Sequence, residues 1–409
     1  MNEPAEFNDE RPPGPALRLL AGGARVGLMA AIYLVMAGLI WAFDAAAAQL
    51  GLPILKFTGL AVDIVLLAWL GVRLGRRGHP IGATIGPLVA LLLVALLFSV
   101  VDWMMHGERA SFWSVANLRM IAVQTSTVAV AALGMTMIII AGGIDLSVGT
   151  TLALCATALA YGLDSGWGIA AAIAACIATG FGAGLVNGSL TSLLGVVPFI
   201  ITLGTMSVYL GLGKLVAKET TVRPPPGAVP DWLPKLVTPY PRPAWLFEPL
   251  LPNFGWGVWL AGGLAVLLAA LLHWTVFGRH VFAIGSNEST ARLCGIHVTR
   301  TKILVYALAG LFVGIAGMYQ FARLTEGSPT AGMGAELKII AAVVIGGGSL
   351  TGGRGSVVGT LTGAAIMLVI ASGCTALGLK NPMQDIIIGA IIVAAVTLDQ
   401  VRHRRLLAS

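Results

Sequence analysis

Charged residues are scarce in this 409-residue chain, since Asp, Glu, Lys and Arg make up only 11% of it while hydrophobic residues make up 57%. Soluble domains carry about 25% charged residues. The mean hydropathy of +0.89 shows the same bias. Long apolar runs recur from near the N-terminus to the C-terminus and leave no room for a large separate soluble domain. The sequence therefore predicts a multi-pass protein whose main solvent is lipid.

Cysteine is equally rare, and the four that occur are Cys155, Cys176, Cys294 and Cys374. No two of them form a CxxC pair, so we expect neither a disulfide framework nor a metal site. The first ten residues are acidic overall and lack the basic start of a signal peptide, so we expect no cleaved leader.

Motifs for catalysis are also missing. The chain contains no GxxxxGK[ST] phosphate-binding loop, which predicts that it does not hydrolyse ATP itself. HExxH and GxSxG patterns are absent too, so we expect no enzyme activity and no cofactor bound by this chain. The net charge of +7 does not indicate a nucleic-acid partner, because Lys and Arg lie mostly between apolar runs, as membrane-flanking charges do.

The apolar runs define twelve candidate spans. They are apolar at both odd and even positions, which favours helices over the alternating strands of a membrane barrel. Basic clusters at Arg73–Arg77 and Arg402–Arg405 abut span ends and place both termini in the cytoplasm. We divide the chain into a polar arm (1–26), an extra N-terminal transmembrane region (27–80), a main transmembrane domain (81–401) and a basic tail (402–409). The spans lie near 27–44, 57–72, 85–101, 118–142, 150–163, 167–186, 198–213, 255–276, 302–322, 338–349, 356–372 and 384–398.

A glycine-rich break with a carboxylate interrupts the apolar runs at residues 141–149. Gly142, Gly143 and Gly149 permit close backbone approach, and Asp145 is the only acidic residue between Glu108 and Asp164. Ionisable groups beside long apolar segments usually have a partner or a function. Asp145 and Ser147 suit helix capping. Contact with a transported solute is the compatible alternative.

Residues 277–302 form a short, polar and basic loop, which we place in the cytoplasm. It contains a turn and then a short helix that starts at Asn287-Glu288 and stops at Gly295. Such an amphipathic helix suits docking into a groove of a soluble partner, with Ala291 and Arg292 at its centre, or lying on the membrane surface.

Two further stretches carry small and polar residues next to apolar runs. Glu336 sits at the mouth of a run, where it could cap a helix, meet a partner or face water. The stretch 346–355 begins with Gly346, Gly347 and Gly348 and continues with Ser349, and it suits close helix packing and a chain reversal. It also echoes residues 138–150, since both lead into Val-Gly-Thr, as in a transporter repeat with broken helices.

Taken in order, these stretches resemble the ribose-type permease family of ABC importers. The resemblance covers about residues 85–401 and is carried by 143–149, by 285–295 with Arg300-Thr301-Lys302, and by 328–337 followed by 346–355. The family implies a ten-helix core, so the two spans before it are additional. Lys338 and Gly348 depart from the residue types common at those positions in the family.

The resemblance implies an importer of monosaccharides or related polyols in a bacterial-type cytoplasmic (inner) membrane. Its partners would be a second permease copy or paralogue, a cytoplasmic ABC ATPase that uses the ATP, and an extracytoplasmic solute-binding protein. The coupling helix that rests on the ATPase would hold Glu288, Ala291, Arg292 and Gly295. The translocation path and helix breaks would hold Gly142, Gly143, Asp145, Ser147, Gly149, Glu336, Gly346, Gly347 and Ser349.

Two alternatives remain open at this point. An ion-coupled secondary transporter would use intramembrane carboxylates, for which Asp63, Asp145 and Asp385 are candidates. A related ABC permease for a nucleoside or a branched-chain amino acid would share the architecture with a different solute.

Overall fold

The computed structural model describes residues 81–238 and 255–408. Within these ranges the chain is helical, and its only strand-like pairing is an isolated bridge between Val222 and Gly327. The elements are α3 (Ile81–His106), η1 (Gly107–Arg109), α4 (Val115–Ile140), α5 (Val148–Asp164), α6 (Ile169–Leu194), α7 (Pro198–Val216), η2 (Pro234–Leu236), α8 (Trp256–Trp274), α9 (Val276–Ser286), α10 (Glu288–Leu293), α11 (Val298–Leu324), α12 (Ala335–Ile345), α13 (Val357–Ala376) and α14 (Asn381–Ala408).

Each of the ten candidate spans predicted after residue 80 corresponds to a helix, so the prediction of an all-α polytopic membrane protein is confirmed. Seven of these helices are long and apolar enough to cross a membrane. By contrast, α5 has 17 residues and α12 has 11, fewer than the ~20 that a straight span needs. The arm 1–26 and the candidate spans 27–44 and 57–72 lie outside the described residues. The helix α14 continues through the basic residues after 401.

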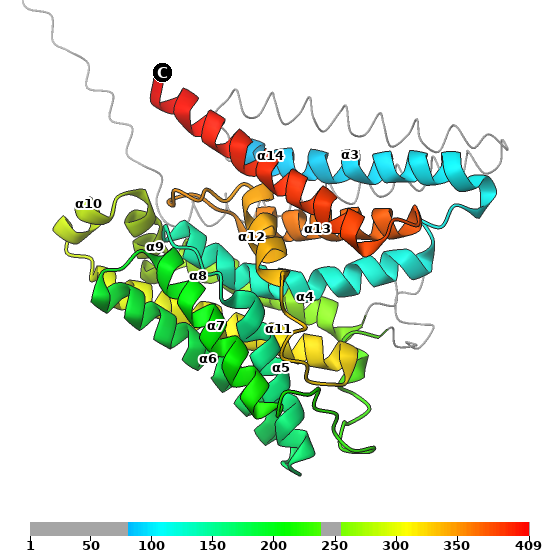
Figure 1. The fold of residues 1–409 in the computed structure, drawn as a ribbon. Helices are drawn as coiled ribbons and strands as arrows, with labels where there is room; N and C mark the ends of the chain where they lie inside the picture. The colour runs from blue at the N-terminus through cyan, green and yellow to red at the C-terminus, as the bar shows by residue number, and fades with distance from the viewer. Residues whose placement is uncertain (1–80, 239–254, 409) are drawn as a thin grey trace, which may run out of the picture. The chain divides into compact units, whose positions relative to one another are not determined.

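Helix α4 is the central element of the described part. Its second half, from Ala129 to Ile140, is almost completely buried. It packs on one side against α11 and on the other against α12 and α13, as Figure 1 shows. A helix that is apolar all round is expected to be buried in this way. The remaining helices form two groups around it, α5, α6 and α7 with α11, and α3 and α14 with α12 and α13.

The closest helix pair is α6 with α11, and a stripe of glycines allows the contact. Gly180, Gly184 and Gly188 recur every four residues and so share one face of α6. A Cβ atom at Gly184 would overlap the carbonyl oxygen of Tyr306, and one at Gly180 would overlap that of Gly310. Small residues at membrane helix interfaces let backbones approach and gain dispersion contacts.

The glycine stripe predicts that Gly184→Ala destabilises the protein by about 1–3 kcal/mol, the cost typical of overpacking a tight contact. Gly182→Ala is the matched control, because Gly182 lies on the same helix with nothing within 4 Å of its Cβ position. Thermal unfolding in detergent measures both. Equal melting temperatures for the two variants would contradict a packing role for Gly184.

Candidate functional site

The break between α4 and α5 runs from Ala141 to Ser147 and is organised by a buried carboxylate. Asp145 is 8% exposed. Its Oδ1 accepts hydrogen bonds from the Ser147 backbone N–H at 2.8 Å and from the Ser147 hydroxyl at 2.6 Å. Ser147 occupies the N-cap position of α5, yet its side chain makes no capping bond of its own. The Asp145 carboxylate therefore accepts the Ser147 backbone N–H at the start of α5. The Ser147 hydroxyl donates to the same carboxylate.

Two side chains from neighbouring helices complete this polar cluster. The Asn187 Nδ2 on α6 donates to the Ser147 Oγ at 2.8 Å and to the Asp145 Oδ2 at 3.3 Å. The Tyr209 hydroxyl on α7 donates to the Asn187 Oδ1 at 3.0 Å. Asn187 is 1% exposed and Tyr209 is 5% exposed. The cluster ties the start of α5 to α6 and α7.

A third residue holds the backbone of the same break. The Thr202 hydroxyl on α7 accepts from the Leu146 N–H at 3.1 Å and lies 3.3 Å from the Ile144 carbonyl oxygen, to which it donates. Sequence analysis missed Asn187, Thr202 and Tyr209. A signal existed for Asn187, which is the only amide side chain in the apolar run of α6.

The hydroxyl of Tyr306 on α11 lies over the glycines of this break. A Cβ atom at Gly143 would lie 2.6 Å from it, so Gly143 leaves the room that the phenol occupies. The Tyr306 hydroxyl is buried and has no hydrogen-bond partner among the described residues. Burying a hydroxyl without a partner is costly, so Tyr306 is the one polar group of this break whose hydrogen bonding within the described residues is unmet.

The N-termini of the two short helices α5 and α12 meet. The connection after α11 packs along α5, with Gly327 against Thr157 and Gly332 against Gly149. A Cβ atom at Gly149 would overlap the Glu336 carboxylate. That carboxylate also accepts the Gly334 N–H at 3.1 Å. A negative side chain between two helix N-termini is favourable, because both ends carry positive partial charge.

The second break, residues 346–356, connects α12 to α13. Gly346 packs directly on the backbone of Gly359. Gly347 adopts a φ of +93°, which favours glycine. The Ser349 hydroxyl lies 2.9 Å from that of Thr351, and the Ser349 N–H donates to the Arg354 carbonyl at 3.2 Å. These bonds satisfy the turn locally, as a chain reversal requires.

The segment predicted as a loop at 277–302 is mostly helical, and this corrects the sequence analysis. Helix α9 occupies 276–286, because Thr275 caps it by accepting the Gly278 N–H at 3.1 Å and because Val281 and Ile284 bury one face. Helix α10 follows from Glu288 to Leu293, capped by the Asn287 side chain, which accepts the Thr290 N–H at 2.9 Å. Figure 1 shows both at one end of the described bundle.

Helix α10 is anchored on one side and exposed on the other. Ala291 is 4% exposed and packs with Ile284 and Val298. Leu293 is 88% exposed, which is unusual for a leucine in a short polar helix. Gly295, with a φ of +83°, ends the helix. Sequence analysis named Ala291 and Gly295 but missed Leu293, whose signal is an apolar side chain outside every apolar run.

An ion-pair network fixes α10 to the start of α11. The Glu288 carboxylate accepts from the Lys302 Nζ at 2.6 Å and from the Arg292 guanidinium at 3.2 Å. The hydrogen bond from Lys302 is the main reason that the pKa of Glu288 lies below its ordinary value. Glu288 is therefore charged throughout the neutral range, and the pair persists until the pH falls to that lowered pKa.

A bundle of membrane-length helices, with two short helices that meet inside it and breaks held by buried polar groups, defines a helical membrane transport protein. The chain belongs to the family described as "branched-chain amino acid transport system / permease component", whose model matches residues 117–396. No solved structure matches the chain significantly.

Curated relatives are similar over most of the chain. The ribose import permease protein of Escherichia coli (strain K12) is 37% identical over 322 residues, which cover 76% of this chain and 92% of the relative. That of Bacillus subtilis (strain 168) is 37% identical over 324 residues, covering 77% and 92%. The fructose import permease protein of Rhizobium meliloti is 32% identical over 323 residues, covering 77% and 84%.

The polar cluster predicts that Asn187→Ala lowers the free energy of unfolding by about 1–3 kcal/mol, because Asp145, Ser147 and Tyr209 each lose a buried partner. Thr179→Ala is the control on the same helix, since the Thr179 hydroxyl bonds only the Ala175 carbonyl of its own helix. Thermal unfolding in detergent compares them. A loss no larger than that of the control would show that the cluster adds little to stability.

Proposed function

We propose that this chain is the membrane-spanning permease subunit of an ATP-driven ABC importer for a monosaccharide or a related polyol. The observation that carries the proposal is α10, a short helix with an exposed leucine, packed by Ala291 and ion-paired through Glu288 at one end of the bundle. Similarity to import permeases for ribose and fructose over most of the chain supports the solute class.

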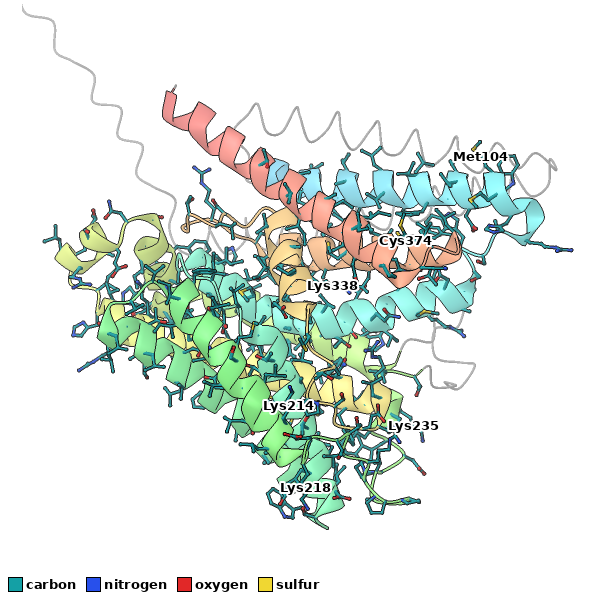
Figure 2. All side chains as sticks on the ribbon, in the orientation of Figure 1. Met104, Lys214, Lys218, Lys235, Lys338 and Cys374 are labelled. Atoms are coloured by element: carbon teal, nitrogen blue, oxygen red, sulfur yellow. The ribbon has the colours of Figure 1, made fainter. Side chains whose placement is uncertain are left out.

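The two ends of α11 support an arrangement in which the two partners bind on opposite sides of the membrane. Its 27 residues give a length of about 40 Å, enough to cross a bilayer. Helix α10 precedes its start, while Gly327, just past its end, pairs with Val222 of the connection 217–238. Figure 2 shows Lys214, Lys218 and Lys235 towards that second end. We assign α10 to the ATPase side and the connection to the side of the solute-binding protein.

With this assignment, α10 and both chain termini would lie in the cytoplasm, and the membrane would be a bacterial-type inner membrane. Helices α9 and α10 carry Arg279 and Arg292, and the start of α11 carries Arg300 and Lys302, in keeping with the bias of basic residues towards the cytoplasm. A second permease copy or paralogue would complete the path. The chain itself would bind no cofactor, and ATP would act through the partner ATPase.

The translocation path would pass the helix breaks. Binding of ATP would close the ATPase domains, move α10 and rock the helices that end at the breaks. Gly142, Gly143, Asp145, Ser147 and Gly149 would lie along the path in the first break. Glu336 would lie where α5 and α12 meet, and Gly346, Gly347 and Ser349 in the second break. Solute selectivity would reside mainly in the binding protein, so a strongly polar site in the bundle is not required.

The ion-coupled alternative has less support in the described residues. Asp145 receives its hydrogen bonds from Ser147 and Asn187, which fix it in the cluster. Asp385 is exposed near the start of α14. Asp63 lies outside the described residues. Within the described residues, Asp145 and Asp385 share no hydrogen-bond partner and so form no relay, which proton or ion coupling would favour.

The proposed function predicts that cells lacking this chain lose uptake of at least one of labelled ribose, fructose or galactose. Depleting ATP with arsenate should abolish that uptake, whereas an uncoupler that spares ATP should leave it, because hydrolysis and not a gradient supplies the energy. The reverse pattern would establish the ion-coupled alternative. Uptake of leucine or a nucleoside in place of sugars would retain the ABC mechanism and correct the solute class.

Helix α10 predicts a second result, measured as ATPase activity that co-purifies with the tagged chain. Leu293→Glu should lower the co-purified activity at least about tenfold, since central apolar anchors of interfaces contribute about 2 kcal/mol or more. Trp232→Glu is the matched control, because Trp232 is a half-exposed apolar side chain in the connection 217–238. An equal loss in both variants would argue against a docking role for α10.

A further inference from the structure

Three segments that are distant in sequence meet at a point made almost wholly of backbone. We call this point the glycine junction and define it by Ile140 and Gly142 at the end of α4, Gly285 at the end of α9, and Gly352 and Gly353 in the second break. The Gly353 N–H donates to the Ile140 carbonyl at 2.8 Å. The junction therefore links the first helix break to the second.

Side chains have no room at two positions of the junction, Gly285 and Gly352. A Cβ atom at Gly285 would overlap the Ile140 carbonyl oxygen and lie 2.5 Å from the Gly353 nitrogen. A Cβ atom at Gly352 would lie 2.6 Å from the Gly285 carbonyl oxygen and 3.0 Å from the Gly142 Cα. The three segments are consequently in direct main-chain contact.

Backbone conformation adds a second, independent requirement for glycine. Gly142, Gly352 and Gly353 have φ values of +79°, +88° and +73°, in the left-handed region that other residues rarely adopt. Gly285 lies in a helix, so at that position space alone requires glycine. An alanine at Gly285 therefore tests the contact without changing the local backbone preference.

Helix α10 is attached directly to this point. Gly285 and Ser286 end α9, and Asn287 caps the start of α10. A Cβ atom at Gly353 would lie 3.0 Å from the Ser286 Cα, so the contact continues to the residue just before the cap. The junction is therefore a direct route from α10 to the end of α4, beside the route through α11, to which Glu288 is ion-paired.

We propose that the glycine junction transmits movement of α10 to the two helix breaks, with Gly285 and Gly353 as positioning residues for coupling. The proposal rests on the proposed function, in which α10 docks on an ATPase. Close-packed protein interiors have low compressibility and transmit strain, and at Gly285 and Gly352 main chain meets main chain with no flexible side chain between them. Movement at α10 then reaches the end of α4 and the connection between α12 and α13 together.

The test uses the complex of the full chain with its co-purified ATPase. Gly285→Ala and Gly353→Ala are compared with Gly262→Ala, a helical glycine of α8 with nothing within 4 Å of its Cβ position. Uptake of labelled ribose, fructose or galactose by cells is divided by the ATPase activity of the purified complex. We expect this ratio to fall about two- to thirtyfold in the junction variants, the range for residues that carry coupling. The control should match the wild type.

Three outcomes distinguish the possibilities. If the junction variants transport as much sugar per ATP hydrolysed as the control does, the junction does not transmit movement. If the wild type itself shows no ATP-dependent uptake, the proposed function is wrong, and the proposed role of the junction is wrong as well. If the variants fail to fold, hydrogen exchange at residues 349–356 of the wild-type complex decides. Protection that changes on adding ATP supports transmission, and unchanged protection overturns it.

Discussion

A lipid bilayer offers no water to the peptide backbone, and this constraint governs each place where the chain departs from a helix. The break at 141–147 satisfies it with side chains, since Thr202 of α7 accepts the Leu146 N–H and Asp145 of the break itself accepts the Ser147 N–H. The break at 346–356 satisfies it with main chain, through the turn at Ser349 and the bond from Gly353 to Ile140. Both breaks persist because the surrounding protein replaces the solvent.

Glycine determines how closely α6 and α11 approach each other, and therefore how close the side chains of α11 come to the first break. On α6 the stripe that includes Gly184 brings Tyr306 of α11 against the helix backbone. The same approach carries the Tyr306 phenol over Gly143. A larger residue in the stripe would displace α11 and, with it, the group that covers the first break. Asn187 of the polar cluster lies on α6 as well, so the stripe and the cluster both depend on the position of that helix.

Much of this arrangement could be predicted from sequence, because long apolar runs predict helices directly and glycine clusters predict the breaks. Helix α9 was not recognised, because Arg279 and His280 interrupt its apolar residues and only Gly278, Val281 and Ile284 are buried. Asn187, Thr202 and Tyr209 were missed for a different reason. Each sits inside an apolar run, and its role arises only when α6 and α7 fold against the start of α5. Leu293 was missed because only the structure shows how much of its side chain is exposed.

The two ends of the first break are held by different kinds of contact. At the start of α5, Asp145, Ser147 and Asn187 interlock through directional hydrogen bonds, and such networks rigidify the elements they join. At the end of α4, contact is made by glycine main chain, which carries no interlocking side chains. In the proposed coupling, a displacement of α10 would therefore reach the end of α4 while α5 stays fixed to α6 and α7. The bend would then concentrate at Gly142 and Gly143, which provide the conformational freedom that a hinge requires.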